Sequence, residues 1–128
     1  MIGKTISHFS VLEKLGEGGM GQVFLALDTD LDRRVALKFL PSSAGLQGGN
    51  EARLLQEARV AAALNHPNIC TIHEIGVTDD GSRFIAMENV PGETLADLVS
   101  RGALDWARAQ GLICKVAKGL AHAHASGV

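Results

Sequence analysis

The strongest constraint on the fold of this chain is the run Gly16–Gly21, which places four glycines within six residues. The run lies between two short segments rich in Val, Leu and Phe, at 9–15 and 22–27, which predicts two strands joined by a glycine loop. A third such segment, 35–40, follows a polar turn and is stopped by Pro41. Three neighbouring strands with short links predict an antiparallel meander.

A helix and two further strands are predicted to follow the meander. Residues 51–64 are mostly helix formers, and Asn50 is a plausible N-cap for them. The stretch 42–50 holds three glycines and predicts a flexible linker. Two β-prone segments, 70–77 and 83–90, flank a polar turn, so the sheet is expected to contain five strands.

The last third of the chain is predicted to be helical. A short helix is expected over 94–100 and a long one over 105–125. The long helix carries an apolar stripe formed by Ile113, Val116, Ala117, Leu120, Ala121 and His124. The predicted fold class is therefore α+β, with a five-stranded antiparallel sheet, one long helix beside it and further helices at the end of the chain.

Composition limits the partners and the location that we expect. Lys and Arg total 12 against 14 Asp and Glu, and a net charge of −2 argues against nucleic acid or an acidic membrane surface as a partner. Cys70 and Cys114 have neither disulfide nor zinc spacing, and no apolar run is long enough for a membrane span. A cytoplasmic location without membrane contact is expected. His122 and His124 lie about 200° apart on a helix, so no metal site is expected.

The glycine run can bind phosphate, because its backbone N–H groups carry partial positive charge and the missing Cβ atoms let oxygen approach. A dinucleotide-binding domain is one alternative, and it predicts a helix beginning near Gly21. The P-loop spacing also fits, but it requires Lys and Ser or Thr where Gln22 and Val23 stand. A third arrangement folds a glycine hairpin over phosphates and adds a strand lysine and a helix glutamate.

All parts of the third arrangement occur in order along the chain. Lys38 ends the strand segment Val35-Ala36-Leu37-Lys38, and Glu57 follows on the predicted helix. The apolar neighbours of Glu57 place it toward the core, where an unpaired carboxylate is costly. We therefore predict an ion pair between Lys38 and Glu57. A solvated Glu57 that pairs with Arg53 on the helix surface is the alternative.

With these motifs in this order, the chain resembles the N-terminal half of the kinase domain of bacterial eukaryotic-like (Hanks-type) Ser/Thr protein kinases, from about Phe9 to the last residue. The resemblance implies a kinase N-lobe at 9–90 and the start of a C-lobe at 91–128. It implies phosphorylation of protein Ser or Thr hydroxyls, with ATP, Mg²⁺ and a protein substrate as partners.

The resemblance also implies which residues bind the nucleotide. Val23 and Ala36 would close on adenine, Met87 would be the gatekeeper, and backbone groups of Glu88 and Val90 in a hinge at 87–90 would bind adenine. Thr94 or Asp97 would either meet the ribose or serve as a helix cap and a surface charge. The expected cofactor-binding residues are Leu15, Gly16, Glu17, Gly18, Gly19, Met20, Gly21, Val23, Ala36, Lys38, Met87, Glu88 and Val90, and the catalytic ion pair is Lys38 with Glu57.

Two motifs that carry chemistry in this family, His-Arg-Asp and Asp-Phe-Gly, do not occur in these 128 residues. They supply the catalytic base and a ligand for Mg²⁺, and the final residues, 124–128, resemble the stretch just before the first of them. We therefore expect the chain to bind nucleotide at most and to be catalytically inactive by itself. A non-catalytic nucleotide-binding or regulatory kinase-like module is the alternative.

Overall fold

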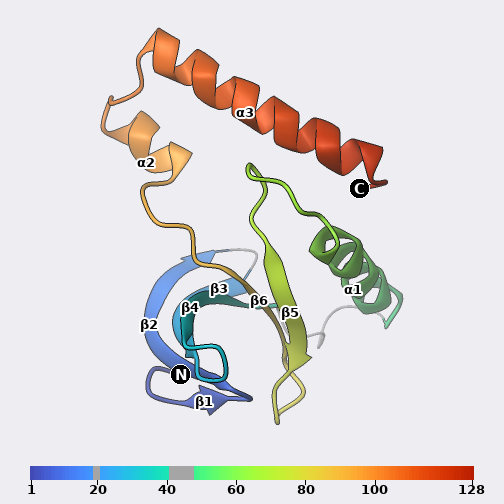
Figure 1. The fold of residues 1–128 in the computed structure, drawn as a ribbon. Helices are drawn as coiled ribbons and strands as arrows, with labels where there is room; N and C mark the ends of the chain where they lie inside the picture. The colour runs from blue at the N-terminus through green and yellow to red at the C-terminus, as the bar shows by residue number, and fades with distance from the viewer. Residues whose placement is uncertain (19–20, 41–47) are drawn as a thin grey trace.

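The computed structural model of the chain describes residues 1–18, 21–40 and 48–128. A strongly curled sheet has helix α1 beside it, and helices α2 and α3 lie beyond one end of the sheet (Figure 1). This arrangement confirms the predicted α+β class. The elements in chain order are β1 (Thr5–Ile6), β2 (Phe9–Gly18), β3 (Gly21–Asp28), β4 (Arg33–Phe39), α1 (Gly48–Ala62), β5 (Ile72–Val77), β6 (Arg83–Glu88), α2 (Leu95–Ser100) and α3 (Trp106–Ala125).

The sheet has six strands in the order β1-β2-β3-β4-β6-β5, and every neighbouring pair is antiparallel. The predicted meander is confirmed as β2-β3-β4, and the β5–β6 hairpin joins it through β6. The prediction of five strands was wrong, because β1 was not foreseen. With only two residues, β1 is too short to show the alternation by which strands are recognised in a sequence.

Helix α1 begins earlier than predicted. It starts at Gly48, so Asn50 lies inside the helix and is not its N-cap, and the linker prediction was wrong for residues 48–50. The rest of the predicted linker, 42–47, lies outside the described residues. Glycine costs about 1 kcal/mol relative to alanine in a helix interior. That cost is small enough for tertiary packing, here the packing of α1 against β5, to override it.

The two final helices begin one residue after the predicted starts. Thr94 is the N-cap of α2, and Asp105 is the N-cap of α3, where its carboxylate accepts a hydrogen bond from the Arg108 N–H at 2.7 Å. Short oxygen-bearing side chains at these positions accept from N–H groups of the first turn that have no partner within the helix. The first residue of each predicted helix is therefore its N-cap.

The hydrophobic core lies on one face of the sheet and contains all four phenylalanines of the chain. The rings of Phe9 and Phe84 meet edge to face with centroids 5.9 Å apart, and those of Phe24 and Phe39 do so at 5.7 Å. Phe39 and Phe84 join the two pairs at 6.2 Å. Such aromatic pairs add about 0.5–1.5 kcal/mol each beyond the burial of their area. The core is thus a chain of rings that crosses four strands.

Gly76 on β5 is a point where this core leaves no room for a side chain. It lies opposite Phe84 in the sheet, and a Cβ at Gly76 would come within 2.4 Å of the Phe84 ring. Because Phe84 is only 1% exposed, the ring cannot move away without disturbing the core. We expect Gly76→Ala to lower the free energy of unfolding by about 1–3 kcal/mol, measured by urea denaturation.

Gly111 on α3 provides the matched control for this substitution. No atom lies within 4 Å of the Cβ that Gly111→Ala would add. The substitution removes backbone freedom from the unfolded chain, and we expect it to raise the free energy of unfolding by up to about 1 kcal/mol. A Gly76→Ala variant as stable as the starting protein would contradict the packing described for Phe84.

Candidate functional site

The face of the sheet opposite the core gathers the residues that sequence reasoning assigned to a ligand. Residues directly opposite each other in an antiparallel pair point to the same face. Val23 lies opposite Lys38, Lys38 opposite Ile85, and Ile85 opposite Ile75. Gly16 lies opposite Val23 from the other side. These five residues therefore form one row across five strands.

A second row runs parallel to the first, two residues further from the glycine turn. It contains Leu25, Ala36 and Met87, which lie opposite one another on β3, β4 and β6. Strand residues two apart share a face, so Ala36 and Lys38 point to the same side of β4. The structure thus brings together five of the predicted site residues: Gly16, Val23, Ala36, Lys38 and Met87.

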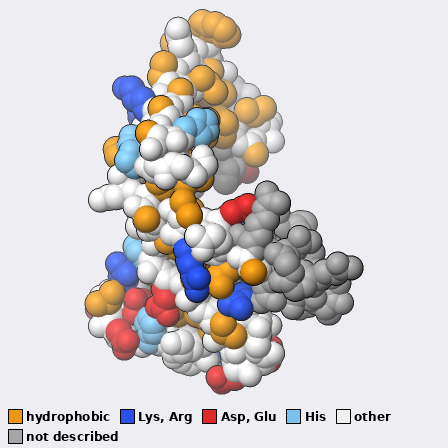
Figure 2. Space-filling view, turned by 90° about the vertical axis from the view of Figure 1, so that its right-hand side faces the viewer, with side chains coloured by type: hydrophobic (Ala, Val, Ile, Leu, Met, Phe, Trp, Pro, Cys, Tyr) orange, Lys and Arg blue, Asp and Glu red, His pale blue; other side chains and the backbone are white. Residues whose placement is uncertain are grey.

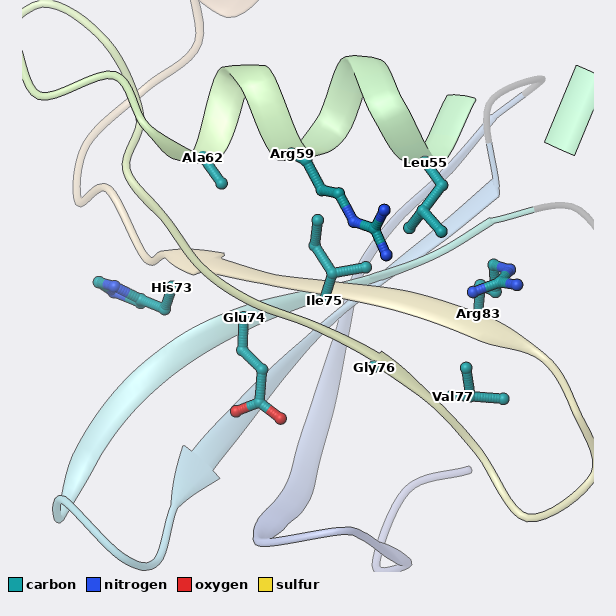
Figure 3. Close-up of a pocket in the computed structure, with 9 residues that line it drawn as sticks. All are labelled: Leu55, Arg59, Ala62, His73, Glu74, Ile75, Gly76, Val77 and Arg83. Carbon is teal, nitrogen blue, oxygen red and sulfur yellow. The ribbon is translucent and has the colours of Figure 1, made fainter. Parts of the chain in front are cut away.

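Helix α1 packs over this same face. Leu55, Arg59 and Ala62 point from α1 toward Ile75 on β5 and line a pocket between helix and strand (Figure 3). Glu74, the residue before Ile75 on β5, points away from the helix. Because Ile75 belongs to the row that contains Lys38, α1 covers the side of the sheet on which the Lys38 side chain lies.

Glu57 does not face the core, and that part of the prediction was wrong. Its side chain is exposed. Glu57 lies two positions from both Leu55 and Arg59, and each position turns an α-helix by about 100°. Glu57 is therefore roughly on the opposite side of the helix from the contact with β5. The half-buried Lys38 takes part in none of the salt bridges between described residues. The Lys38–Glu57 ion pair stays a prediction.

The loop between the two strands of the glycine hairpin is shorter than predicted. Strand β2 continues to Gly18 and β3 begins at Gly21, and these two residues are paired. Gly21 has φ of +107°, a conformation that favours glycine. The strand that begins at Gly21 excludes the dinucleotide-binding alternative, which requires a helix there. Gly19 and Met20 lie outside the described residues.

The Glu17 side chain turns away from the predicted ligand face. Glu17 lies opposite Gln22 and shares that row with Phe39, a core residue. Its carboxylate forms a salt bridge with Lys14 and accepts a hydrogen bond from Gln22 Nε2 at 3.1 Å. Only the backbone of Glu17 can therefore serve a ligand on the Lys38 side. Sequence reasoning assigned no role to Lys14 or Gln22, because Lys14 and Glu17, three residues apart, would point to opposite faces of a regular strand.

The predicted hinge, 87–90, begins inside strand β6, whose last two residues are Met87 and Glu88. The Glu88 N–H donates to the Thr71 carbonyl at 2.8 Å, and the Glu88 carbonyl, which accepts from the Cys70 thiol, keeps a second lone pair for a further hydrogen bond. The Cys70 thiol lies 3.5 Å from that carbonyl, and burial raises the pKa of the thiol, which keeps it protonated. Val90, two residues beyond the strand, is exposed.

Thr94 and Asp97 form a helix cap. The Asp97 N–H donates to Thr94 Oγ1 at 3.0 Å, and the Thr94 N–H donates to Asp97 Oδ2 at 3.3 Å. This reciprocal capping box satisfies two N–H groups at the start of α2. Of the two roles considered for these residues, the structural one is the one present here.

Helix α3 meets the sheet domain at the turn 66–69. The Ile69 N–H donates to the His66 carbonyl at 3.1 Å and closes a tight turn. A Cβ at Gly119 would lie 3.1 Å from the Asn68 carbonyl oxygen, so the backbone of α3 comes very close to the turn. The rings of His66 and His122 lie 5.0 Å apart.

The apolar stripe of α3 is largely uncovered. Ile113, Val116 and Leu120 are 60%, 49% and 52% exposed. Figure 2 shows hydrophobic side chains gathered over the upper part of the molecule, where α2 and α3 lie. Among the described residues, no helix is long and apolar enough to cross a membrane, and no group of three or more His, Cys, Asp or Glu could hold a metal ion.

Comparison with known proteins agrees with this geometry. Residues 9–128 match the family model described as the protein kinase domain. The chain is 40% identical to Serine/threonine-protein kinase pkn3 of Myxococcus xanthus over 129 residues, which covers 99% of this chain and 24% of that protein. It is 38% identical to Serine/threonine-protein kinase PrkC of Bacillus subtilis, covering 97% of this chain and 19% of that protein.

A solved structure gives the same result. The crystal structure of the Mycobacterium tuberculosis PknI kinase domain superposes with a TM-score of 0.83 at 30% identity, over 100% of this chain and 52% of that one. The chain therefore spans about half of that kinase domain and no more than a quarter of the two curated relatives described above.

Proposed function

The chain belongs to the protein kinase family, with bacterial Ser/Thr kinases among its relatives, and on that premise we propose that its sheet binds ATP on the face that carries Lys38. In a complete kinase domain, the same face would present the γ-phosphate to a protein Ser or Thr hydroxyl. The observation that carries the proposal is the pair of cross-strand rows on this face.

The row of Ala36 and Met87 suits adenine. The side chain of Ala36 is smaller than those of its neighbours Leu25 and Met87, so a flat apolar ring can lie over Ala36 and against Val23. The Glu88 carbonyl and the Val90 backbone come after Met87 in the chain, and the edge of the adenine ring would form hydrogen bonds with them. Met87 is half-buried at the back of this slot.

The row nearer the glycine turn suits phosphate. Lys38 brings a positive charge into the row that begins at Gly16, and Gly16 has no side chain to fill the space. A ligand that lies along the face from Ala36 toward Gly16 would therefore have its base over the apolar row and its phosphates at Lys38. Backbone N–H groups of the glycine turn add further partial positive charge.

Glu57 is proposed as the partner of Lys38 in the nucleotide-bound domain. Helix α1 already lies over the correct face of the sheet, and a rotation about its axis that releases its present contact with β5 would turn Glu57 toward Lys38. Such an ion pair would hold the ammonium in place for the α- and β-phosphates. Because His-Arg-Asp and Asp-Phe-Gly are absent from these 128 residues, we propose that this polypeptide alone binds nucleotide without transferring phosphate.

Substitution of Lys38 tests this binding mode. We expect Lys38→Met to weaken the binding of ATP to the chain about 10- to 100-fold, since a charge-assisted contact to phosphate contributes about 1.5–3 kcal/mol. The binding of adenosine, which has no phosphate, is expected to stay unchanged. Isothermal titration calorimetry with ATP, with adenosine as a competitor, measures both affinities.

Lys118→Met on the exposed surface of α3 is the control, because it removes the same charge from a helix that is not part of the sheet. It is expected to leave both affinities unchanged. Equal weakening of ATP and adenosine by Lys38→Met would contradict a phosphate contact, and unaltered ATP binding would contradict the proposed site.

The uncovered stripe of α3 predicts self-association of the 128-residue polypeptide. Ile113, Val116 and Leu120 present contiguous apolar surface, and such surface is rarely left exposed in monomers. We expect the purified chain to elute as oligomers in size-exclusion chromatography with light scattering at micromolar concentration. Replacement of Ile113 and Leu120 by Gln is expected to shift it toward the monomer. A wild-type chain that remains monomeric would refute this prediction.

A further inference from the structure

Glu17 connects the two strands of the glycine hairpin on the side away from the ligand face. Its two carboxylate oxygens have different partners: Oε2 binds the Lys14 ammonium and Oε1 accepts from Gln22 Nε2. Lys14 and Glu17 belong to β2, whereas Gln22 belongs to β3. The three side chains, which we call the hairpin brace, therefore join the strands just before the chain enters the turn.

A bulge in β2 makes the brace possible. Lys14 pairs with Phe24 and Gly16 pairs with Val23, so β2 advances two residues while β3 advances one. The extra residue is Leu15. In a regular strand, residues three apart point to opposite faces. Because of the bulge, Lys14 and Glu17 point to the same face and can meet.

The brace cannot touch a ligand on the Lys38 side. Phe24, opposite Lys14, and Phe39, in the row of Glu17 and Gln22, both belong to the core face. Gly16, between Lys14 and Glu17 in the chain, belongs to the row of Lys38. Any effect of the brace on a nucleotide must therefore pass through the position of the hairpin backbone.

We propose that Glu17 is a positioning residue that holds the glycine-rich hairpin at a fixed height over the phosphates by bridging Lys14 and Gln22. This proposal rests on the proposed nucleotide site. A glycine-rich hairpin has little side-chain packing of its own and so loses much backbone freedom when it becomes ordered. Contacts on its outer side that order it before the nucleotide arrives reduce that cost at binding.

The charge on Glu17 gives the brace a pH dependence with a definite sign. The hydrogen bond from Lys14, followed by that from Gln22, lowers the pKa of the Glu17 carboxyl from its usual 4.5. Two groups face this carboxylate among the described residues: the charged ammonium of Lys14 on β2 and the neutral amide of Gln22 on β3. Because the pKa is lowered in the folded state, the brace is intact above pH 4.5 and is lost only as pH falls through the lowered pKa.

Two measurements on the 128-residue chain test the proposal. The first is hydrogen exchange at the amides of Gly18 and Gly21 without nucleotide, which reports hairpin opening directly. The second is the ratio of ATP to adenosine affinity. We expect Glu17→Gln and Lys14→Met each to speed exchange and to weaken ATP, but not adenosine, by about two- to fivefold, the range of an exposed ion pair.

Rescue and control variants separate positioning from general damage. The charge-swapped pair Lys14→Glu with Glu17→Lys rebuilds the ion pair, and the Gln22 amide can turn its oxygen toward the new ammonium, so it is expected to restore both readouts. Asp79→Asn removes a carboxylate from the exposed turn between β5 and β6, outside both rows of the ligand face, and is expected to change neither. In wild type, hairpin protection should hold from pH 7 to 4.5 and fall below it, with no such step in Glu17→Gln.

The outcomes distinguish the brace from the binding site. Unchanged exchange in Glu17→Gln, or failure of the charge swap to restore exchange, overturns the brace. If wild type does not bind ATP but Glu17→Gln speeds exchange and the swap restores it, the brace stands as a structural device and the proposed nucleotide site fails. If ATP binds and Glu17→Gln changes exchange but not the ATP-to-adenosine ratio, the positioning role is overturned.

Discussion

The antiparallel pairing of β3 with β4 is the constraint on which the rest of the structure depends. Seven consecutive residue pairs without a bulge keep the alternation of side chains in phase along both strands. Phe24 and Leu37 thereby face the core, while Val23 and Lys38 face the other side. The same ladder that stabilises the sheet thus separates residues that pack from residues that remain available to a ligand.

Much of this arrangement could be predicted from the sequence, because it depends on local pattern. The β-prone segments at 22–27 and 35–40 were close to β3 and β4, and a period of two residues places Ala36 and Lys38 on one face whatever the details of packing. The row that joins Val23 to Lys38 follows once the two strands form a meander. The starts of α2 and α3 were predicted to within one residue for a similar reason, since the chemistry of Thr94 and Asp105 acts within one helical turn.

The features that were missed depend on tertiary structure. The facing of Glu57 depends on how α1 is rotated against β5, and several faces of a helix rich in small and charged residues can pack almost equally well. The facing of Glu17 depends on a single extra residue at Leu15, and a bulge leaves little trace in composition. The start of α1 depends on packing that outweighs the unfavourable glycines at 48 and 49. In each case, the missing information lies in a neighbouring element.

The close approach at Gly119 has a mechanical consequence. Helix α3 is connected to the sheet through the chain at 89–94, and it touches the turn 66–69 at a second, separate place. A body attached at one point can swing in any direction, but a body attached at two points can turn only about the line that joins them. The line that joins residues 89–94 to the contact of Gly119 with the Asn68 carbonyl is therefore the axis about which we expect the helical part to turn most easily against the sheet.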